Sequence, residues 1–371
     1  MSAPDADERF MQRALELAAR GGRATRPNPL VGAVIVRDGI VVAEGFHAIV
    51  GGDHAEVDAL RRAGDRARGA TVYVNLEPCS HFGRTPPCAD ALVKAGVRRV
   101  VAGMIDPNPR VSGRGLRMLE GAGIETRVGV LEDACRALNE RFVVHVSERR
   151  PFVIAKLAQS LDGRVATRSG ESQWISGPEA RAEVHALRAS VDAILVGTET
   201  ALRDNPRLTA RDAQGQVVAS TPRRFVLDRL GRLPDHLQLF SDGAAQTTVL
   251  TALPPDAERC ARWNAQGVEV WSLPEGDEGG LDLVAACARM GSEDLQGLLV
   301  EGGGRLVGGL FDLGLVDRLV AYVHPMVLGG TTAPMAVGGK GVEHLAGAYR
   351  SRRTQVEAVG QDWRFTLDFR P

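Results

Sequence analysis

Short apolar runs and helical patterns alternate along the first third of the chain. Strand-type apolar runs span residues 31–36, 40–43, 70–75 and 97–104. Asp38-Gly39 separates the first two runs and is a hairpin-turn dipeptide. Apolar residues at helical spacing predict helices over 54–63, which Gly64 ends, and over 89–95. Strands and helices that alternate in this way are typical of an α/β layered domain.

The pattern of this first domain fades over residues 141–148, and a join follows. Pro151 suits neither a helix interior nor a strand ladder, and a new apolar strand follows it at 152–157. A chain of 371 residues is too long for one such domain of roughly 150 residues. We therefore expect two domains, residues 1–148 and 149–371, and see no repeat of the first in the second.

Composition places the chain among ordinary globular proteins. It is 44% hydrophobic and 25% charged, with a net charge of −1, and no apolar stretch approaches the roughly 20 residues of a membrane span. The acidic N-terminus lacks the apolar segment of an export signal. Five cysteines indicate a reducing cytoplasm rather than a disulfide framework, and we expect Cys135, Cys260 and Cys287 to be buried.

One imidazole, one carboxylate and two thiols stand close together in the sequence. His54 and Glu56 open the helix predicted over 54–63, and Cys79 and Cys88 each follow a proline. One nitrogen and two sulfur ligands leave a zinc ion an open position, where it lowers the pKa of a water molecule. Glu56 would then carry the proton from that water to a leaving amine without binding the metal.

The spacing of the two cysteines departs from the usual Cys-x-x-Cys, because eight residues separate them. A loop that contains Gly83 and Pro86 can fold back at little entropic cost. One alternative is that the histidine and the cysteines are ordinary core residues. Another is a structural zinc, which usually has four ligands. His81 is either that fourth ligand or a substrate contact, and we favour a substrate contact.

These groups are the parts that a zinc deaminase needs, and charge separates two classes of substrate for such an enzyme. Enzymes that act on tRNA or single-stranded DNA need a basic track for phosphates and aromatic side chains for base stacking. A net charge of −1 and an aromatic content of 5% offer neither. We therefore expect a small molecule as substrate, for whose negative charge one or two cations such as Arg84 suffice, and neither nucleic acid nor membrane as a partner. The alternative is a nucleoside or nucleic-acid base deaminase with a non-catalytic C-terminal domain.

A glycine-rich turn stands out in the second half of the chain. Residues 301–304 follow an apolar strand at 298–300 and precede a helix predicted over 305–313. Three glycines at such a turn let backbone N–H groups approach a phosphate at the helix start. A tight turn without a ligand has the same pattern. The motif is not Gly-x-Gly-x-x-Gly, so a Rossmann domain is not predicted.

Several runs of residues resemble the bifunctional riboflavin-biosynthesis deaminase/reductase family. Residues 27–34, 76–88 and 106–109 are similar to its deaminase half, which also has the long spacing between the cysteines. Its reductase half is similar to residues 156–164, 170–176, 197–206 and 301–304 of this chain. These runs come in the same order as in the family. The resemblance spans nearly the whole chain and is thinnest over 230–290. One difference is Asp58, where the family often has histidine.

The resemblance implies a cytidine-deaminase-like three-layer domain at the N-terminus and a dihydrofolate-reductase-like domain, with a mixed sheet flanked by helices, at the C-terminus. It implies zinc on His54, Cys79 and Cys88, with Glu56 as the proton carrier. The pyrimidine and ribose-phosphate pocket would be lined by Asn28, His81, Arg84, Asp106 and Asn108. NADPH would be held by Ala158, Trp174, Thr200, Asp204, Gly303, Gly304, Gly308 and Gly309. The substrate of the reductase would be held by Ser172, Leu208, Arg211 and Glu301.

The family also implies two consecutive reactions. The first domain would hydrolyse the 2-amino group of 2,5-diamino-6-(5-phosphoribosylamino)pyrimidin-4-one and release ammonia. The second would open the ribose and deliver hydride from NADPH to its C1, which gives a ribitylamino chain. Lys156 and Glu301 are the candidates for polarising the ribose or relaying protons. The family further suggests a homo-oligomer, either a dimer or a tetramer.

Overall fold

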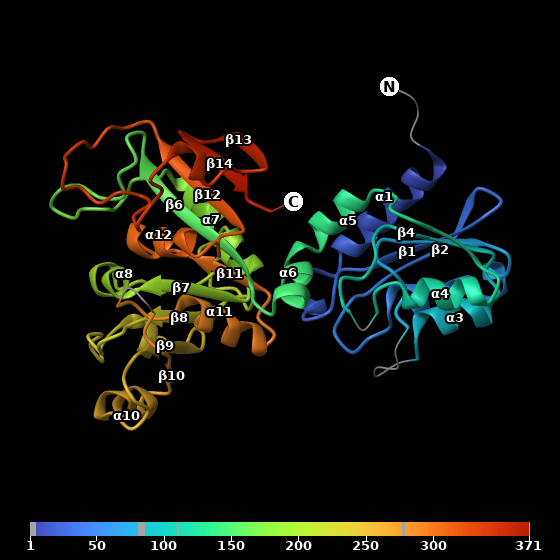
Figure 1. The fold of residues 1–371 in the computed structure, drawn as a ribbon, viewed down its shortest axis with the longest axis horizontal. Helices are drawn as coiled ribbons and strands as arrows, with labels where there is room; N and C mark the ends of the chain where they lie inside the picture. The colour runs from blue at the N-terminus through green and yellow to red at the C-terminus, as the bar shows by residue number, and fades with distance from the viewer. Residues whose placement is uncertain (1–4, 81–85, 110, 277–278, 371) are drawn as a thin grey trace. The chain divides into compact units, whose positions relative to one another are not determined.

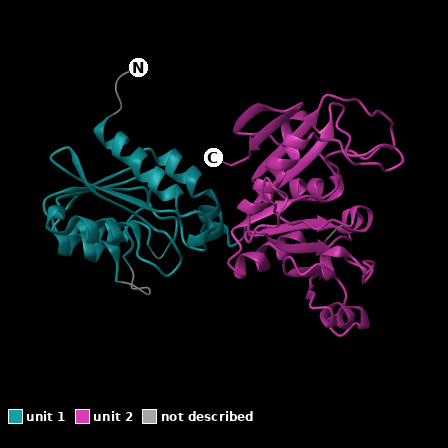
Figure 2. Cartoon of the chain, turned by 180° about the vertical axis from the view of Figure 1, so that it is seen from behind, with its two compact units in different colours: residues 1–149 teal, residues 150–371 magenta. Residues whose placement is uncertain are grey.

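The computed structural model of the chain describes residues 5–80, 86–109, 111–276 and 279–370. It divides into two compact units, Met1–Arg149 and Arg150–Pro371, each with its own sheet and hydrophobic core (Figure 2). This division falls one residue after the boundary expected from the sequence. Within the described residues, no helix has the length and apolar character needed to cross a bilayer.

The first unit is a five-stranded sheet between two layers of helices (Figure 1). Its sheet has the order β2-β1-β3-β4-β5, with β1 antiparallel to β2 and β3, and with β3, β4 and β5 parallel. Its elements are α1 (Ala6–Ala19), η1 (Gly22–Thr25), β1 (Gly32–Arg37), β2 (Ile40–Phe46), α2 (Ala55–Ala63), η2 (Gly64–Ala67), β3 (Thr71–Val74), α3 (Cys88–Ala95), β4 (Arg99–Ala102), α4 (Arg114–Gly121), β5 (Glu125–Val128), α5 (Glu132–Leu138) and α6 (Glu140–Glu148).

Alternation along the strands explains the three layers. Successive side chains of a strand point to opposite faces of the sheet. Ala33 and Ile35 of β1 therefore pack with the core under α2, α3 and α4. Val34 and Val36 of the same strand pack with the core under α1 and α5. Figure 1 shows α3 and α4 on one face of the sheet and α1 and α5 on the other.

The hairpin and helices predicted for this unit are confirmed, with small changes at their ends. Arg37 pairs with Ile40 across the turn, and both Asp38 and Gly39 have positive φ, as a two-residue hairpin turn of type I′ requires. The last apolar run, 97–104, forms a strand only over its centre, and Val97 and Met104 are buried in the flanking segments.

The second unit is built on a nine-stranded mixed sheet with the order β10-β9-β8-β7-β11-β6-β12-β14-β13. The strands from β10 to β12 are parallel, and β14 runs antiparallel to both β12 and β13. Its strands are β6 (Phe152–Ser160), β7 (Ala193–Gly197), β8 (Arg223–Leu227), β9 (Thr247–Thr251), β10 (Glu269–Ser272), β11 (Gly297–Val300), β12 (Arg318–His324), β13 (Arg353–Val359) and β14 (Asp362–Asp368). Its helices are α7 (Pro178–Ser190), α8 (Thr198–Asp204), α9 (Gln238–Ser241), α10 (Glu258–Ala265), α11 (Leu283–Ser292), α12 (Gly304–Asp312) and η3 (Leu345–Gly347).

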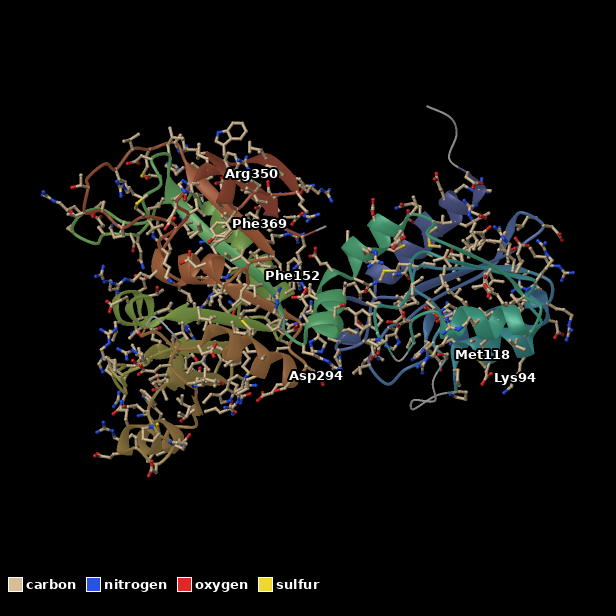
Figure 3. All side chains as sticks on the ribbon, in the orientation of Figure 1. Lys94, Met118, Phe152, Asp294, Arg350 and Phe369 are labelled. Carbon is tan, nitrogen blue, oxygen red and sulfur yellow. The ribbon has the colours of Figure 1, made fainter. Side chains whose placement is uncertain are left out.

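A core packed on this sheet joins its strands to α11 and α12. Val153, Leu195 and Leu298 from neighbouring strands share one cluster with Met290 and Leu310 of the two helices. Phe369, labelled in Figure 3, meets Phe311 of α12 edge to face with 5.3 Å between ring centroids. The helix predicted over 305–313 is thus confirmed, one residue earlier than expected.

The three cysteines outside the predicted metal site are buried and free, as the sequence indicated.

Most strands of the second sheet are parallel and joined by helices. In sheets of this kind, ligands bind outside the carboxyl ends of the strands. In this unit β11 leads directly into the glycine-rich turn. The strands β6, β7 and β8 run parallel to β11, so their carboxyl ends lie at the same edge of the sheet.

Candidate functional site

Three side chains from different elements converge in the first unit. His54 immediately precedes α2, Cys79 follows β3, and Cys88 is the first residue of α3. Nδ1 of His54 lies 3.1 Å from Sγ of Cys88 and 3.6 Å from Sγ of Cys79, and the three atoms all lie within 4.8 Å of one another. One imidazole nitrogen and two sulfurs at this spacing suit the ligand preference of zinc.

The two thiols are joined by a backbone hydrogen bond. The N–H of Cys88 donates to Sγ of Cys79 at 3.2 Å. Hydrogen bonds from Cys88, and then from His54, lower the pKa of the Cys79 thiol to about 4 against the effect of burial. Since the thiolate is the form that binds metal, this arrangement prepares Cys79 as a ligand.

Glu56 lies in the first turn of α2, beside these ligands. The residue is 3% exposed, and its carboxylate hydrogen-bonds the thiol of Cys88. Burial, and then the charge of Cys79, raises the pKa of Glu56 to about 7. Within the described residues the metal-binding group contains only His54, Cys79 and Cys88, so Glu56 stands beside it as a carboxyl group able to take and return a proton.

A buried histidine that the sequence did not single out holds Asn28. His47 is 3% exposed, and its Nδ1–H donates to the carbonyl of Asp53 at 2.9 Å. Its Nε2 therefore accepts from Nδ2 of Asn28, at 3.1 Å. Burial lowers the pKa of His47, which favours this neutral form. The ring also meets His54 edge to face at 5.6 Å, so Asn28 is held next to the metal ligands.

Asp106 and Asn108 lie in the segment after β4. Oδ1 of Asp106 accepts the N–H of Asn108 at 2.8 Å. β3 and β4 are parallel neighbours, so this segment and the one that carries Cys79 leave the same edge of the sheet. The expected pocket residues Asn28, Asp106 and Asn108 thus come from elements around the metal ligands. His81 and Arg84 lie outside the described residues.

A large cavity of about 1980 Å³ opens at the carboxyl ends of the strands in the second unit. It is lined by most of the residues that the sequence predicted for cofactor and substrate, namely Lys156, Ala158, Ser172, Trp174, Thr200, Asp204, Leu208, Arg211, Glu301, Gly303, Gly304 and Gly309. Trp174 is 68% exposed, so it lies at the cavity rather than in the hydrophobic core. The guanidinium of Arg181 stacks over its ring at 4.7 Å.

Gly308 differs from the other predicted glycines because it does not line this cavity. A Cβ at Gly308 would lie 2.1 Å from the carbonyl carbon and oxygen of Gly338. Its lack of a side chain is therefore required by packing between α12 and the segment that contains Gly338. Among the residues that the structure describes, a Cβ at Gly309 would meet only Leu283, at 3.8 Å, so that position has room.

Three charged residues that line this cavity interact: Lys156, Arg188 and Glu301. Of these, Arg188 was not predicted from the sequence. Arg188 donates from Nε and Nη2 to the two oxygens of Glu301, at 2.6 and 2.8 Å. Burial alone would raise the pKa of Glu301, but Arg188 and then Lys156 lower it below its ordinary value. Burial also lowers the pKa of Lys156, against the attraction of Glu301. The site thus holds a buried carboxylate paired with Arg188 and a buried amine whose pKa is lowered.

Each unit matches a known protein family. Residues 4–104 match the cytidine and deoxycytidylate deaminase zinc-binding region, and residues 151–365 match the RibD C-terminal domain. The riboflavin biosynthesis protein RibD of Escherichia coli is 44% identical over 366 residues, which cover 96% of this chain and 97% of the relative. That of Synechocystis is 41% identical over 360 residues, covering 97% and 95%. The chain belongs to the RibD family.

Solved RibD-family structures share the whole fold. RibD of Acinetobacter baumannii, in its form 1, has a TM-score of 0.85 and 38% identity, with 98% of each chain covered. A Thermotoga maritima protein described as a diaminohydroxyphosphoribosylaminopyrimidine deaminase/5-amino-6-(5-phosphoribosylamino)uracil reductase has a TM-score of 0.83 and 35% identity, again with 98% covered. The expected fold class, a cytidine-deaminase-like domain followed by a dihydrofolate-reductase-like domain, is confirmed.

Membership of the RibD family also fixes the type of enzyme. The chain is a bifunctional deaminase and reductase of riboflavin biosynthesis that acts on pyrimidine intermediates of that pathway. His54, Cys79 and Cys88 form its zinc site. The reductase unit implies a nicotinamide cofactor.

Proposed function

We propose that the first unit hydrolyses the 2-amino group of 2,5-diamino-6-(5-phosphoribosylamino)pyrimidin-4-one and that the second reduces the ribosyl group of the product with NADPH. The Thermotoga maritima relative is described by the same two activities. The observation that carries the proposal for this chain is the convergence of His54, Cys79 and Cys88 beside the buried carboxyl of Glu56.

The donor set fits zinc, since the thiol of Cys79 is already prepared as a thiolate and His54 turns one ring nitrogen toward both sulfurs. When bound there, zinc supplies Lewis-acid activation of water. Glu56 takes a proton from the attacking water and delivers it to the departing amine. Its burial keeps bulk water from competing for that proton.

Asn28, Asp106 and Asn108 are the proposed contacts to the pyrimidine and its ribose phosphate among the described residues. His47 fixes the amide of Asn28 in one orientation, because its neutral ring accepts only from the amide nitrogen. His81 and Arg84 remain proposed contacts, of the ring and of the phosphate respectively.

In the second unit we propose that NADPH lies against the glycine-rich turn and the start of α8, with the substrate beside Glu301. The proposed cofactor contacts are Ala158, Trp174, Thr200, Asp204, Gly303, Gly304 and Gly309; the proposed substrate contacts are Ser172, Leu208, Arg211 and Glu301. Bound NADPH supplies the hydride. Ring opening with hydride addition at C1 takes up one proton, at the former ring oxygen, and Lys156 and Glu301 are the proposed residues that relay it there.

Purified full-length protein tests this function. Ammonia release from the diaminopyrimidine should require zinc and should stop when a chelator removes it. NADPH oxidation should begin only after deamination, and NADH should be a poorer donor. Ammonia release from cytidine at a comparable rate, or NADPH oxidation with the undeaminated substrate, would contradict the proposed order and substrate.

Two further expectations follow the family and stay predictions for this chain. We expect a homo-oligomer, a dimer or tetramer, which light scattering of the purified protein measures. We also expect the cytoplasm as its compartment, because zinc-binding thiols are kept reduced there.

A further inference from the structure

Glu77 connects two parts of the deaminase unit that are distant in sequence. It lies between β3 and Cys79, and it is 3% exposed. Its Oε2 accepts the backbone N–H groups of Asp106 at 3.2 Å and Gly113 at 2.8 Å. Its Oε1 accepts those of Gly115 at 2.9 Å and Leu116 at 3.4 Å. Hydrogen bonds of this kind to a carboxylate are among the stronger ones in proteins.

These bonds attach both ends of one loop to a single side chain. The loop runs from Asp106, after β4, to Gly113, at the start of α4. Inside it, the carbonyl of Asn108 accepts the N–H groups of Val111 at 2.8 Å and Ser112 at 3.0 Å. Together with the bond from Asn108 to Asp106, they fold the described part of the loop into a compact turn.

α4 also packs directly on the segment that leads to the zinc ligand. A Cβ at Gly115 would lie 1.9 Å from the carbonyl oxygen of Pro78 and 3.3 Å from Oε1 of Glu77. Only a glycine allows this approach. The Gly113-x-Gly115 pair, which resembles part of a nucleotide motif, therefore serves contact with Glu77 and Pro78, next to Cys79.

We propose that Glu77 is a positioning residue for deamination: it fixes the loop of Asp106 and Asn108 at a set place relative to the zinc ligand Cys79. The inference rests on the proposed contact of Asp106 and Asn108 with the ribose phosphate of the substrate. Glu77 acts through this loop, so its loss weakens substrate binding while the metal and Glu56 stay in place.

Glu77→Gln tests the proposal, because it keeps the size of the side chain and turns an amide NH2 toward the backbone donors. We expect KM for the diaminopyrimidine to rise about tenfold, with kcat changed less than about threefold. Zinc content and NADPH-dependent reductase activity should stay at the parent values. The matched control is Glu120→Gln, an exposed carboxylate at the other end of α4, which should change none of these quantities.

Binding without turnover gives an independent readout. Calorimetry with the diaminopyrimidine on Glu56→Gln and on Glu56→Gln/Glu77→Gln should show the same loss of affinity as the rise in KM. Loss of zinc from Glu77→Gln would overturn the proposal, since the carboxylate would then support the metal ligands themselves. A fall in kcat with KM unchanged would overturn it as well.

Asn108→Ala separates this inference from the function on which it rests. If Asn108→Ala raises KM and Glu77→Gln does not, positioning by Glu77 is wrong while the substrate pocket stands. If neither changes KM, the proposed pocket fails, and the inference fails with it. In the double variant the two effects should not add, because both act through one loop, and full additivity would contradict that coupling.

Discussion

Arg188 donates two hydrogen bonds to Glu301, from Nε to Oε1 at 2.6 Å and from Nη2 to Oε2 at 2.8 Å. Arg188 comes from α7, and Glu301 follows β11 at the carboxyl edge of the sheet. Planar two-point pairing of this kind fixes the carboxylate in orientation as well as in charge. The reductase cavity therefore has an anchored anion at its centre, with Lys156 nearby.

Removal of this cation should change the pH dependence of reduction. Burial favours the protonated form of Glu301, and Arg188 is the largest influence that lowers its pKa. In Arg188→Gln the pKa of Glu301 should rise, so the acid limb of kcat/KM for reduction should move to higher pH. At neutral pH we expect a loss of about tenfold or more. The pH profile of NADPH oxidation measures this.

Deamination serves as the control for Arg188→Gln and should keep the parent rate and pH profile, because its site lies in the other unit. Arg188→Lys should recover only part of the activity, since an ammonium cannot pair with both oxygens in the same plane. An unchanged acid limb in Arg188→Gln would show that Glu301 does not titrate in the reductive step.

Glu56→Gln should abolish proton transfer while the metal stays bound. The amide fills nearly the same space but cannot take a proton from water, so ammonia release should fall by a factor of about 10² to 10⁴. Metal analysis should give the parent zinc content, and the reductase should be unaffected. A variant that deaminates at the parent rate would remove Glu56 from its assigned role.

Cys79→Ser should lose both zinc and deamination. The hydroxyl of serine is not a thiolate and does not replace a sulfur ligand. NADPH oxidation with the deaminated intermediate should continue, since no described ligand of this metal lies beyond Arg149. Cys135→Ala, which removes a buried thiol outside the ligand group, should keep its zinc. Loss of both activities in Cys79→Ser would argue against independent sites.

Gly308→Ala and Gly309→Ala separate packing from cofactor contact in α12. A methyl group at Gly308 would collide with Gly338, so we expect a destabilisation of about 1–3 kcal/mol from overpacking. Gly309→Ala should be as stable as the parent, since its Cβ has room. Thermal unfolding measures the stability of both variants. The unfolding transition whose midpoint temperature rises when NADPH is added belongs to the second unit. Weaker NADPH binding in Gly308→Ala with unchanged stability would instead indicate a direct contact.

The zinc site was predictable because its ligands lie within one short stretch, two at the starts of helices and one after a strand. His54, Cys79 and Cys88 needed only a strand–helix pattern to converge. Arg188 could not be found in this way, because it lies in the last turn of a helix, far from Glu301 in the sequence, and only the order of the strands brings the two together. Glu77 and His47 were similarly hidden, since their partners are backbone groups and side chains that only the fold brings near.

The glycine-rich turn shows a different limit. The family resemblance implied NADPH contacts at Gly303, Gly304, Gly308 and Gly309, and the turn pattern at 301–304 fitted both a phosphate site and a tight turn without a ligand. A missing side chain makes room for a ligand or for another stretch of backbone, and the pattern is the same in both cases. At Gly308 the neighbour is Gly338, and a Cβ at Gly304 would likewise lie 2.2 Å from the carbonyl of Met335.

The separate hydrophobic clusters of the two units have a consequence for how such an enzyme is encoded. Each of these three clusters draws its described members from one side of the division at Arg149, so each unit has an apolar core of its own. One continuous chain that carries both cores supplies the two successive catalysts in equal number, whatever the strength of expression.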